Sequence, residues 1–283
     1  MESARKKRNE EMEPAQHDTR KILAFYNNPD IAASYGRQHY ITPCERLLFD
    51  TYIKPGMAIL DIGVGGGRTS EYLARDASRY VGIDYAPEMI QICQKKYPQR
   101  EFALSSATDL SLFQDGSFNA VVMSYNMLDD VIPEENRWQC VAECHRVLKN
   151  GGLLIFSSHN PRAVIIRPEW KKRKASATKP GAAQTNLFSR LMSWKLQLHE
   201  FCSAVKSTAA TITCYATKAP FWRGEGHMLD GEGLMTHFWI PAKVIAELVR
   251  FGFDFIAMQG DDYPRKSHSL ITGWYYYVFS KRA

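Results

Sequence analysis

Short apolar runs alternate with polar and helical stretches along the middle of the chain. The runs that read as buried strands are residues 57–62, 79–84, 101–105, 118–123 and 153–157. A helix is predicted over 134–148, because its spacing is helical and Asn150-Gly151-Gly152 behind it is a strong C-terminal stop. Strands that alternate with helices predict an α/β domain.

The alternation breaks between residues 161 and 240 and then resumes. A helix with one apolar face is predicted over 241–251, and two more strands over 254–258 and 274–280. The eighty residues of the break are too many for a structureless loop in a compact domain. They contain a predicted helix, 186–201, and a β-rich stretch, 208–217.

This pattern divides the chain into three parts. Residues 1–20 have balanced charges and are predicted to form a flexible tail. Residues 21–160 and 241–283 form one α/β domain, in which 21–54 are helical. Residues 161–240 follow the fifth strand and would lie above the carboxyl ends of the strands, where ligands bind in open α/β sheets. We therefore interpret them as a substrate cap.

A glycine-rich turn joins the first strand to its helix. Glycines stand at 63, 65, 66 and 67, and such bare backbone lets a nucleotide-like ligand approach closely. A dinucleotide fingerprint starting at Gly63 needs glycine at 68, where this chain has Arg68. The spacing Asp61-x-Gly63-x-Gly65-x-Gly67 instead resembles the first motif of the class I S-adenosylmethionine-dependent methyltransferases.

Further positions agree with this resemblance. Asp84 ends the second strand 21 residues after Gly63, the spacing at which a βαβ unit places an acid against ribose hydroxyls. A helix N-cap is the alternative role for this carboxylate. The sequence from Arg146 to Leu154 is typical of the family between its fourth and fifth strands. The resemblance implies a doubly wound, Rossmann-like sheet of seven mostly parallel strands, with the last strand antiparallel.

The resemblance also implies which residues bind the donor. Residues similar to Tyr85 and Met89 pack on the adenine in that family. The family usually has Asp where this chain has Ser106, which removes one expected contact but leaves the backbone N–H of Ala107 for the ring. The segment around Tyr35 resembles the N-terminal helix of ubiquinone/menaquinone-type methyltransferases, where a similar tyrosine lies over the donor. The full predicted donor set is Tyr35, Asp61, Gly63, Gly65, Gly67, Asp84, Tyr85, Met89, Ser106, Ala107 and Ser124.

Candidate acceptor-binding residues are fewer and rest on position. Aromatic walls suit a cationic donor, so Tyr26 and Tyr125 are candidates, although each reads equally well as an ordinary core or surface aromatic. Phe221, Trp222 and His237 belong to the predicted cap and should flank the acceptor.

A candidate general base follows the fifth strand. His159 comes directly after that strand and faces the expected cleft, which makes it the candidate catalytic residue. The alternative is a hydrogen-bonded structural histidine, which is the commoner role of a lone histidine.

Composition narrows the class of protein. At 283 residues and 45% hydrophobic, the chain can bury a full core, and no apolar run is long enough to span a membrane. The six cysteines are scattered without a C-x-x-C pair, and Cys140 and Cys144 at helical spacing are interpreted as buried thiols. We therefore expect a cytoplasmic protein without a metal site.

The net charge of +6 includes a basic run at 162–179. Such a run can grip nucleic acid, but we interpret it as a solvated loop. The sequence thus favours a methyltransferase that uses S-adenosylmethionine, forms S-adenosylhomocysteine and acts on a small molecule. An RNA methyltransferase and a non-catalytic donor-binding protein remain alternatives. Neither the methylated atom nor the oligomeric state follows from the residues.

Overall fold

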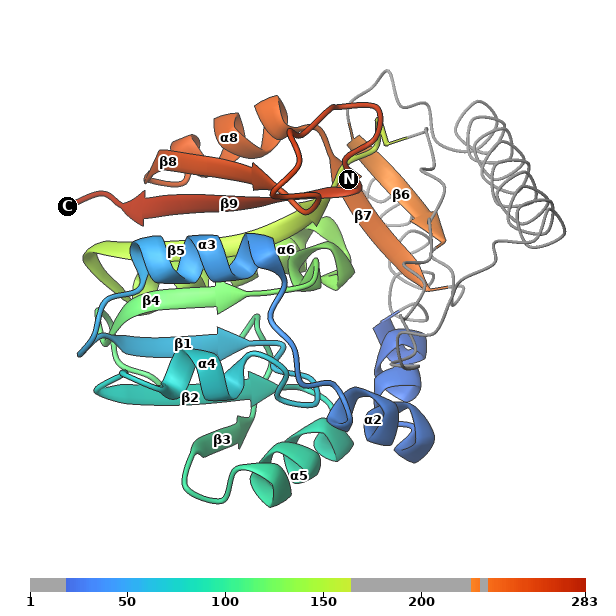
Figure 1. The fold of residues 1–283 in the computed structure, drawn as a ribbon, viewed down its shortest axis with the longest axis vertical. Coiled ribbons are helices and arrows are strands. Elements are labelled where there is room, and N and C mark those ends of the chain that lie inside the picture. The colour runs from blue at the N-terminus through green and yellow to red at the C-terminus, as the bar shows by residue number, and fades with distance from the viewer. Residues whose placement is uncertain (1–18, 164–224, 230–233) are drawn as a thin grey trace, which may run out of the picture.

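A computed structural model describes residues 19–163, 225–229 and 234–283. Its main element is a seven-stranded sheet in the order β3-β2-β1-β4-β5-β9-β8 (Figure 1). The strands are β1 (Ala58–Ile62), β2 (Arg79–Asp84), β3 (Glu101–Leu104), β4 (Phe118–Met123), β5 (Leu148–His159), β8 (Phe253–Gly260) and β9 (Trp274–Lys281). The first five pair in parallel, and β9 runs antiparallel to both β5 and β8. The predicted sheet with an antiparallel last strand is therefore confirmed.

Helices cover both faces of this sheet. The helical elements are residues 19–26, α2 (Pro29–Gly36), α3 (Pro43–Tyr52), α4 (Ser70–Ala74), α5 (Pro87–Lys96), η1 (Met127–Asp130), α6 (Glu134–Val147) and α8 (Pro241–Arg250). On one face α6 and α8 pack on Leu60 and Val121, and on the other α3, α4 and α5 pack with Ile59 and Val122. Neighbouring residues of one strand thus enter opposite cores, which explains why these strands are apolar throughout.

Several predicted boundaries shift by a few residues. Helix α6 ends at Val147, because Leu148 already pairs with Phe118 and opens β5. Residues 19 and 20 of the predicted tail are helical, and the rest of that tail lies outside the described residues. Cys140 and Cys144 are buried free thiols, as predicted.

The predicted cap is described only in part. Within it, β6 (Glu225–Leu229) and β7 (Met235–Trp239) form an antiparallel hairpin beyond the carboxyl ends of the parallel strands (Figure 1). Strand β7 packs beside η1 and β5. The predicted helix 186–201 and β-rich stretch 208–217 lie outside the described residues. Among the described helices, none combines the length and apolar character of a bilayer span.

Candidate functional site

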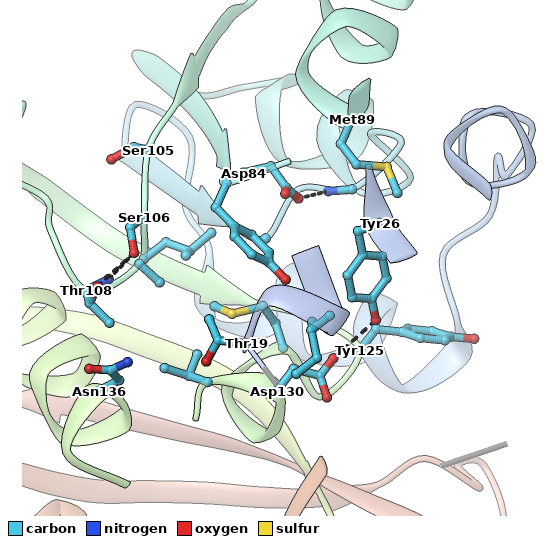
Figure 2. A pocket seen from close by; sticks show the side chains of 18 of the residues that line it. Thr19, Tyr26, Asp84, Met89, Ser105, Ser106, Thr108, Tyr125, Asp130 and Asn136 are labelled. Atoms are coloured by element: carbon cyan, nitrogen blue, oxygen red, sulfur yellow. Dashed lines mark hydrogen bonds between the residues drawn. The ribbon is translucent and has the colours of Figure 1, made fainter. Parts of the chain in front are cut away.

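A cavity opens at the carboxyl edge of the parallel strands, where β1, β2 and β4 end (Figure 2). Residues 19–36 close it from the side opposite the sheet. Most of the predicted site residues line this one cavity. They are Tyr26, Tyr35, Gly63, Gly65, Asp84, Tyr85, Met89, Ser106, Ala107, Ser124 and Tyr125. The structure thus brings together residues that lie between positions 26 and 125 of the sequence.

The glycine turn after β1 brings the backbone of α2 against the loop. Gly63 and Gly65 have φ of +69° and +53°, a conformation that glycine adopts without strain. A Cβ built on Gly66 would lie 2.3 Å from the carbonyl carbon of Tyr35, so a side chain there would collide with the C-terminal turn of α2. At Gly65 a Cβ would meet only the Tyr35 ring, at 3.5 Å, on the cavity side. The loop therefore presents open backbone to the cavity at Gly65.

Asp84 lies at the end of β2 with both carboxylate oxygens held. Oδ2 accepts from the Gly65 backbone N–H and Oδ1 from that of Ala86, each at 2.9 Å. Burial raises the pKa of this carboxyl, and the backbone donors oppose that rise. The carboxylate thus joins the glycine loop to Ala86 and also borders the cavity. The N-cap of α5 is Ala86, which has no side-chain cap, so Asp84 does not take the alternative role of helix N-cap.

Two members of the predicted donor set lie beneath the cavity. Asp61 is 1% exposed and accepts from the hydroxyls of Thr69 at 2.8 Å and Tyr80 at 2.9 Å. Burial raises its pKa to about 6. A Cβ on Gly67 would face Tyr97, away from the lining. Asp61 and Gly67 therefore shape the loop from below.

Aromatic rings form the wall opposite Ser106 and Thr108 (Figure 2). Tyr26 meets Tyr35 edge to face at 5.8 Å between ring centroids. Tyr125 follows β4 and covers the guanidinium of Arg68, whose carbon lies 4.6 Å from the ring centroid.

His159 lies at the end of β5 but does not belong to the cavity lining. Its Nδ1 is 2.8 Å from Asp129 Oδ2, and its Nε2 is 3.1 Å from Asn126 Nδ2. Because a carboxylate only accepts, Nδ1–H is the donor to Asp129 and Nε2 accepts from Asn126. Both ring nitrogens are engaged with neighbouring side chains.

Of the acceptor residues expected from the cap, His237 is the one within the described residues, and it does not line the cavity. His237 is fully buried on β7, with its ring 5.2 Å from that of Trp239. Phe221 and Trp222 lie outside the described residues.

Sequence reasoning missed part of the lining. The additional residues are Thr19, Ile22, Ile62, Ser105, Thr108, Met127, Asp130, Val131, Ile132 and Asn136. Several belong to η1 and the turn after it, where the sequence shows only the acidic pair Asp129-Asp130 close behind a strand end. That pair, at the ligand-binding edge of a parallel sheet, was the available signal. In the described residues, no group of three or more His, Cys, Asp or Glu is placed to hold a metal ion.

Comparison with known proteins places the chain in a family. Residues 60–156 match the model of a methyltransferase domain. The chain is 34% identical over 110 residues to the ubiquinone biosynthesis O-methyltransferase of Xanthomonas campestris, a match covering 38% of this chain and 44% of that protein. It is 30% identical over 161 residues to an uncharacterized methyltransferase of Synechocystis, covering 56% of this chain and 69% of that one. The match to the Xanthomonas campestris protein thus spans less than half of that protein's length.

Solved structures agree at the level of the fold. A S-adenosylmethionine-dependent methyltransferase from Methanosarcina mazei superposes with a TM-score of 0.55 at 18% identity, covering 83% of this chain and 97% of that one. The 1,6-didemethyltoxoflavin N1-methyltransferase of Burkholderia thailandensis gives 0.56 at 12% identity, covering 96% and 90%. With the glycine motif, the sheet order and the Synechocystis relative in agreement, the chain belongs to the class I S-adenosylmethionine-dependent methyltransferases.

Proposed function

We propose that this chain transfers a methyl group from S-adenosylmethionine to a small-molecule acceptor and releases S-adenosylhomocysteine. The observation that supports this most is the convergence of Gly63, Gly65 and Asp84 on one cavity that is otherwise apolar and aromatic. The name of one similar protein also includes a small-molecule acceptor, 1,6-didemethyltoxoflavin, and the similar O-methyltransferase of Xanthomonas campestris is named for ubiquinone biosynthesis.

The residues of the cavity fit the donor. The open backbone at Gly65 leaves room for the amino-acid portion, which a Cβ there would restrict. Asp84 offers carboxylate oxygens at the cavity surface for ribose hydroxyls. Tyr85 and Met89 would pack on the adenine, with Ser106 and Ala107 at its edge.

When bound, the donor supplies a methyl group on a sulfonium, which is electrophilic without further activation. The task left to the chain is to orient the acceptor and to exclude water. Tyr26, Tyr35 and Tyr125 serve this task as aromatic walls that tolerate positive charge. The predicted cap, residues 161–240, would complete the enclosure.

A general base at His159 would act through Nε2, because Nδ1–H donates to Asp129. Asn126 covers Nε2, so this role requires the amide to turn away. Without that movement, His159 supports η1 through Asp129 and acts as a positioning residue.

Calorimetric titration with S-adenosylhomocysteine tests the donor site. Asp84→Ala is expected to weaken binding by about 1–3 kcal/mol, because ribose hydroxyls lose a charged acceptor. Asp115→Ala is the matched control, because its carboxylate is 80% exposed and remote from the cavity. Equal affinity in wild type and Asp84→Ala would contradict the assignment.

Turnover is tested with labelled donor and a fractionated metabolite extract, in parallel with total RNA. Label in a small-molecule fraction supports the proposal. Label in RNA would favour an RNA methyltransferase that uses the basic run 162–179, which lies mostly outside the described residues. Binding of S-adenosylhomocysteine without any labelled product would favour a non-catalytic binding protein.

A further inference from the structure

Two consecutive carboxylates on η1 have contrasting surroundings. Asp129 is fully buried and accepts three hydrogen bonds, from Ser158 Oγ at 2.7 Å, from the His159 backbone N–H at 2.7 Å and from His159 Nδ1 at 2.8 Å. Asp130 lines the cavity, and the Tyr26 hydroxyl donates to its Oδ2 over a longer 3.2 Å. Asp129 is therefore a structural carboxylate, whereas Asp130 faces ligand space with weaker support.

The surroundings of Asp130 disfavour an isolated negative charge. Burial raises its pKa to about 6, and the neighbouring Asp129 carboxylate adds to that rise, while the Thr236 and Tyr26 hydroxyls and His159 oppose it. A carboxylate removed from water is stabilised most by a cation that pairs with it. Among the described residues lining the cavity there is no lysine, arginine or histidine to serve as that cation.

Asp130 lies apart from Ser106, one of the residues proposed at the edge of the adenine. The other carboxylate of the lining, Asp84, already accepts two backbone hydrogen bonds. Figure 2 shows Asp130 and Tyr26 directed toward one another, away from Ser106 and Thr108 on the adenine side. Aromatic rings next to a carboxylate form a site that favours positive charge.

We propose that Asp130 binds a cationic nitrogen of the methyl acceptor, so that the acceptor is a small molecule carrying a protonated amine or a comparable cationic group. This inference rests on the proposed methyl-transfer function and extends it to the class of acceptor. Acceptors that carry a carboxylate would be repelled from the same position.

The test uses three probes that share one ring and differ in charge: 2-phenylethylamine, 2-phenylethanol and 3-phenylpropionate. Each is titrated calorimetrically into protein saturated with S-adenosylhomocysteine. The amine is expected to bind about tenfold or more tightly than the alcohol, as a charge-assisted hydrogen bond provides. Asp130→Asn should reduce this preference to about twofold or less, and the surface control Asp30→Asn should keep it.

The pH dependence supplies a second measurement on the unmodified protein. The amine preference should decline as the pH falls through about 6, because Asp130 becomes protonated while the probe stays charged. Other titratable groups also face this carboxylate, namely Asp129, His159, Tyr26 and Tyr85. Loss of the pH dependence in Asp130→Asn would assign that dependence to Asp130.

Several results would overturn the inference. One is that the wild-type protein binds no amine, or that it prefers the alcohol or the acid to the amine. Another is that Asp130→Asn keeps the preference for the amine. If Asp130→Asn weakens S-adenosylmethionine but not S-adenosylhomocysteine, then the carboxylate serves the donor's sulfonium instead. Absence of S-adenosylhomocysteine binding in the wild type would refute the proposed function itself, whereas normal binding without an amine preference refutes this inference alone.

Discussion

The turns that follow β1 and β4 both border the cavity, but they reach left-handed backbone by different routes. After β1 the residues with positive φ are the glycines Gly63, Gly65 and Gly67, which carry no penalty there. After β4 they are Tyr125 and Asn126, with φ of +58° and +60°. For residues with a Cβ such backbone costs about 1–2 kcal/mol each. The first turn is therefore specified locally, whereas the second depends on contacts from elsewhere.

Those contacts come from distant parts of the chain. The Asn126 backbone N–H donates to Ser157 Oγ at 2.7 Å, and the Tyr125 hydroxyl lies 2.7 Å from that of Tyr40. Arg68 stacks against Tyr125 from the end of the glycine turn, which links the two turns directly. Strained backbone of this kind persists where surrounding structure over-determines it, and it clusters at functional sites.

Removal of Arg68 gives the largest expected effect, because this side chain joins both turns. It pairs with the fully buried Glu45, which Arg68→Ala would leave as an uncompensated charge. We expect a loss of about 3–5 kcal/mol in the free energy of unfolding, measured by urea denaturation. Arg79→Ala is the control, since its pair with Glu101 is half exposed and should contribute about 1 kcal/mol or less. Similar losses in the two variants would show that Arg68 does not connect the turns energetically.

The turn after β1 lies over the buried carboxyl of Asp61, which predicts that the stability of the protein depends on pH. The pKa of Asp61 is raised to about 6, so its contribution to stability is present below its unfolded pKa of about 4 and is lost as the pH rises through about 6. As the pH rises from about 4 to about 6, the unfolding free energy of the wild type should therefore fall by about 3 kcal/mol relative to that of Asp61→Asn. The hydroxyls of Thr69 and Tyr80 retain an acceptor in the amide. A difference that stays flat from about pH 4 to 7 would refute this prediction.

The smallest effect isolates the backbone cost after β4. Asn126→Ala and Asn126→Gly both remove the amide that contacts His159, but only alanine keeps a Cβ in left-handed backbone. The glycine variant should be more stable than the alanine variant by about 1 kcal/mol, again by urea denaturation. Equal stabilities would mean that the turn after β4 is unstrained.

The same contrast explains what the sequence could predict. The strands, the glycine turn and Asp84 follow from local spacing, and the structure has each strand at its predicted place with ends shifted by a few residues. Asp130 could not be assigned, because its contact with Tyr26 joins positions 104 residues apart. The motif also grouped Asp61 with the donor site, although its side chain points from a buried strand into the layer beneath the loop.

The placement of β9 has a consequence for how the protein is made. This strand lies inside the sheet, between β5 and β8, although it follows both in the chain. While the ribosome is still synthesising the last strand, β5 has an unpaired edge that can pair with other chains. Closure of the sheet therefore waits until its other six strands have been made, and substitutions in β9 should reduce the yield of folded protein more than equally buried substitutions in β1.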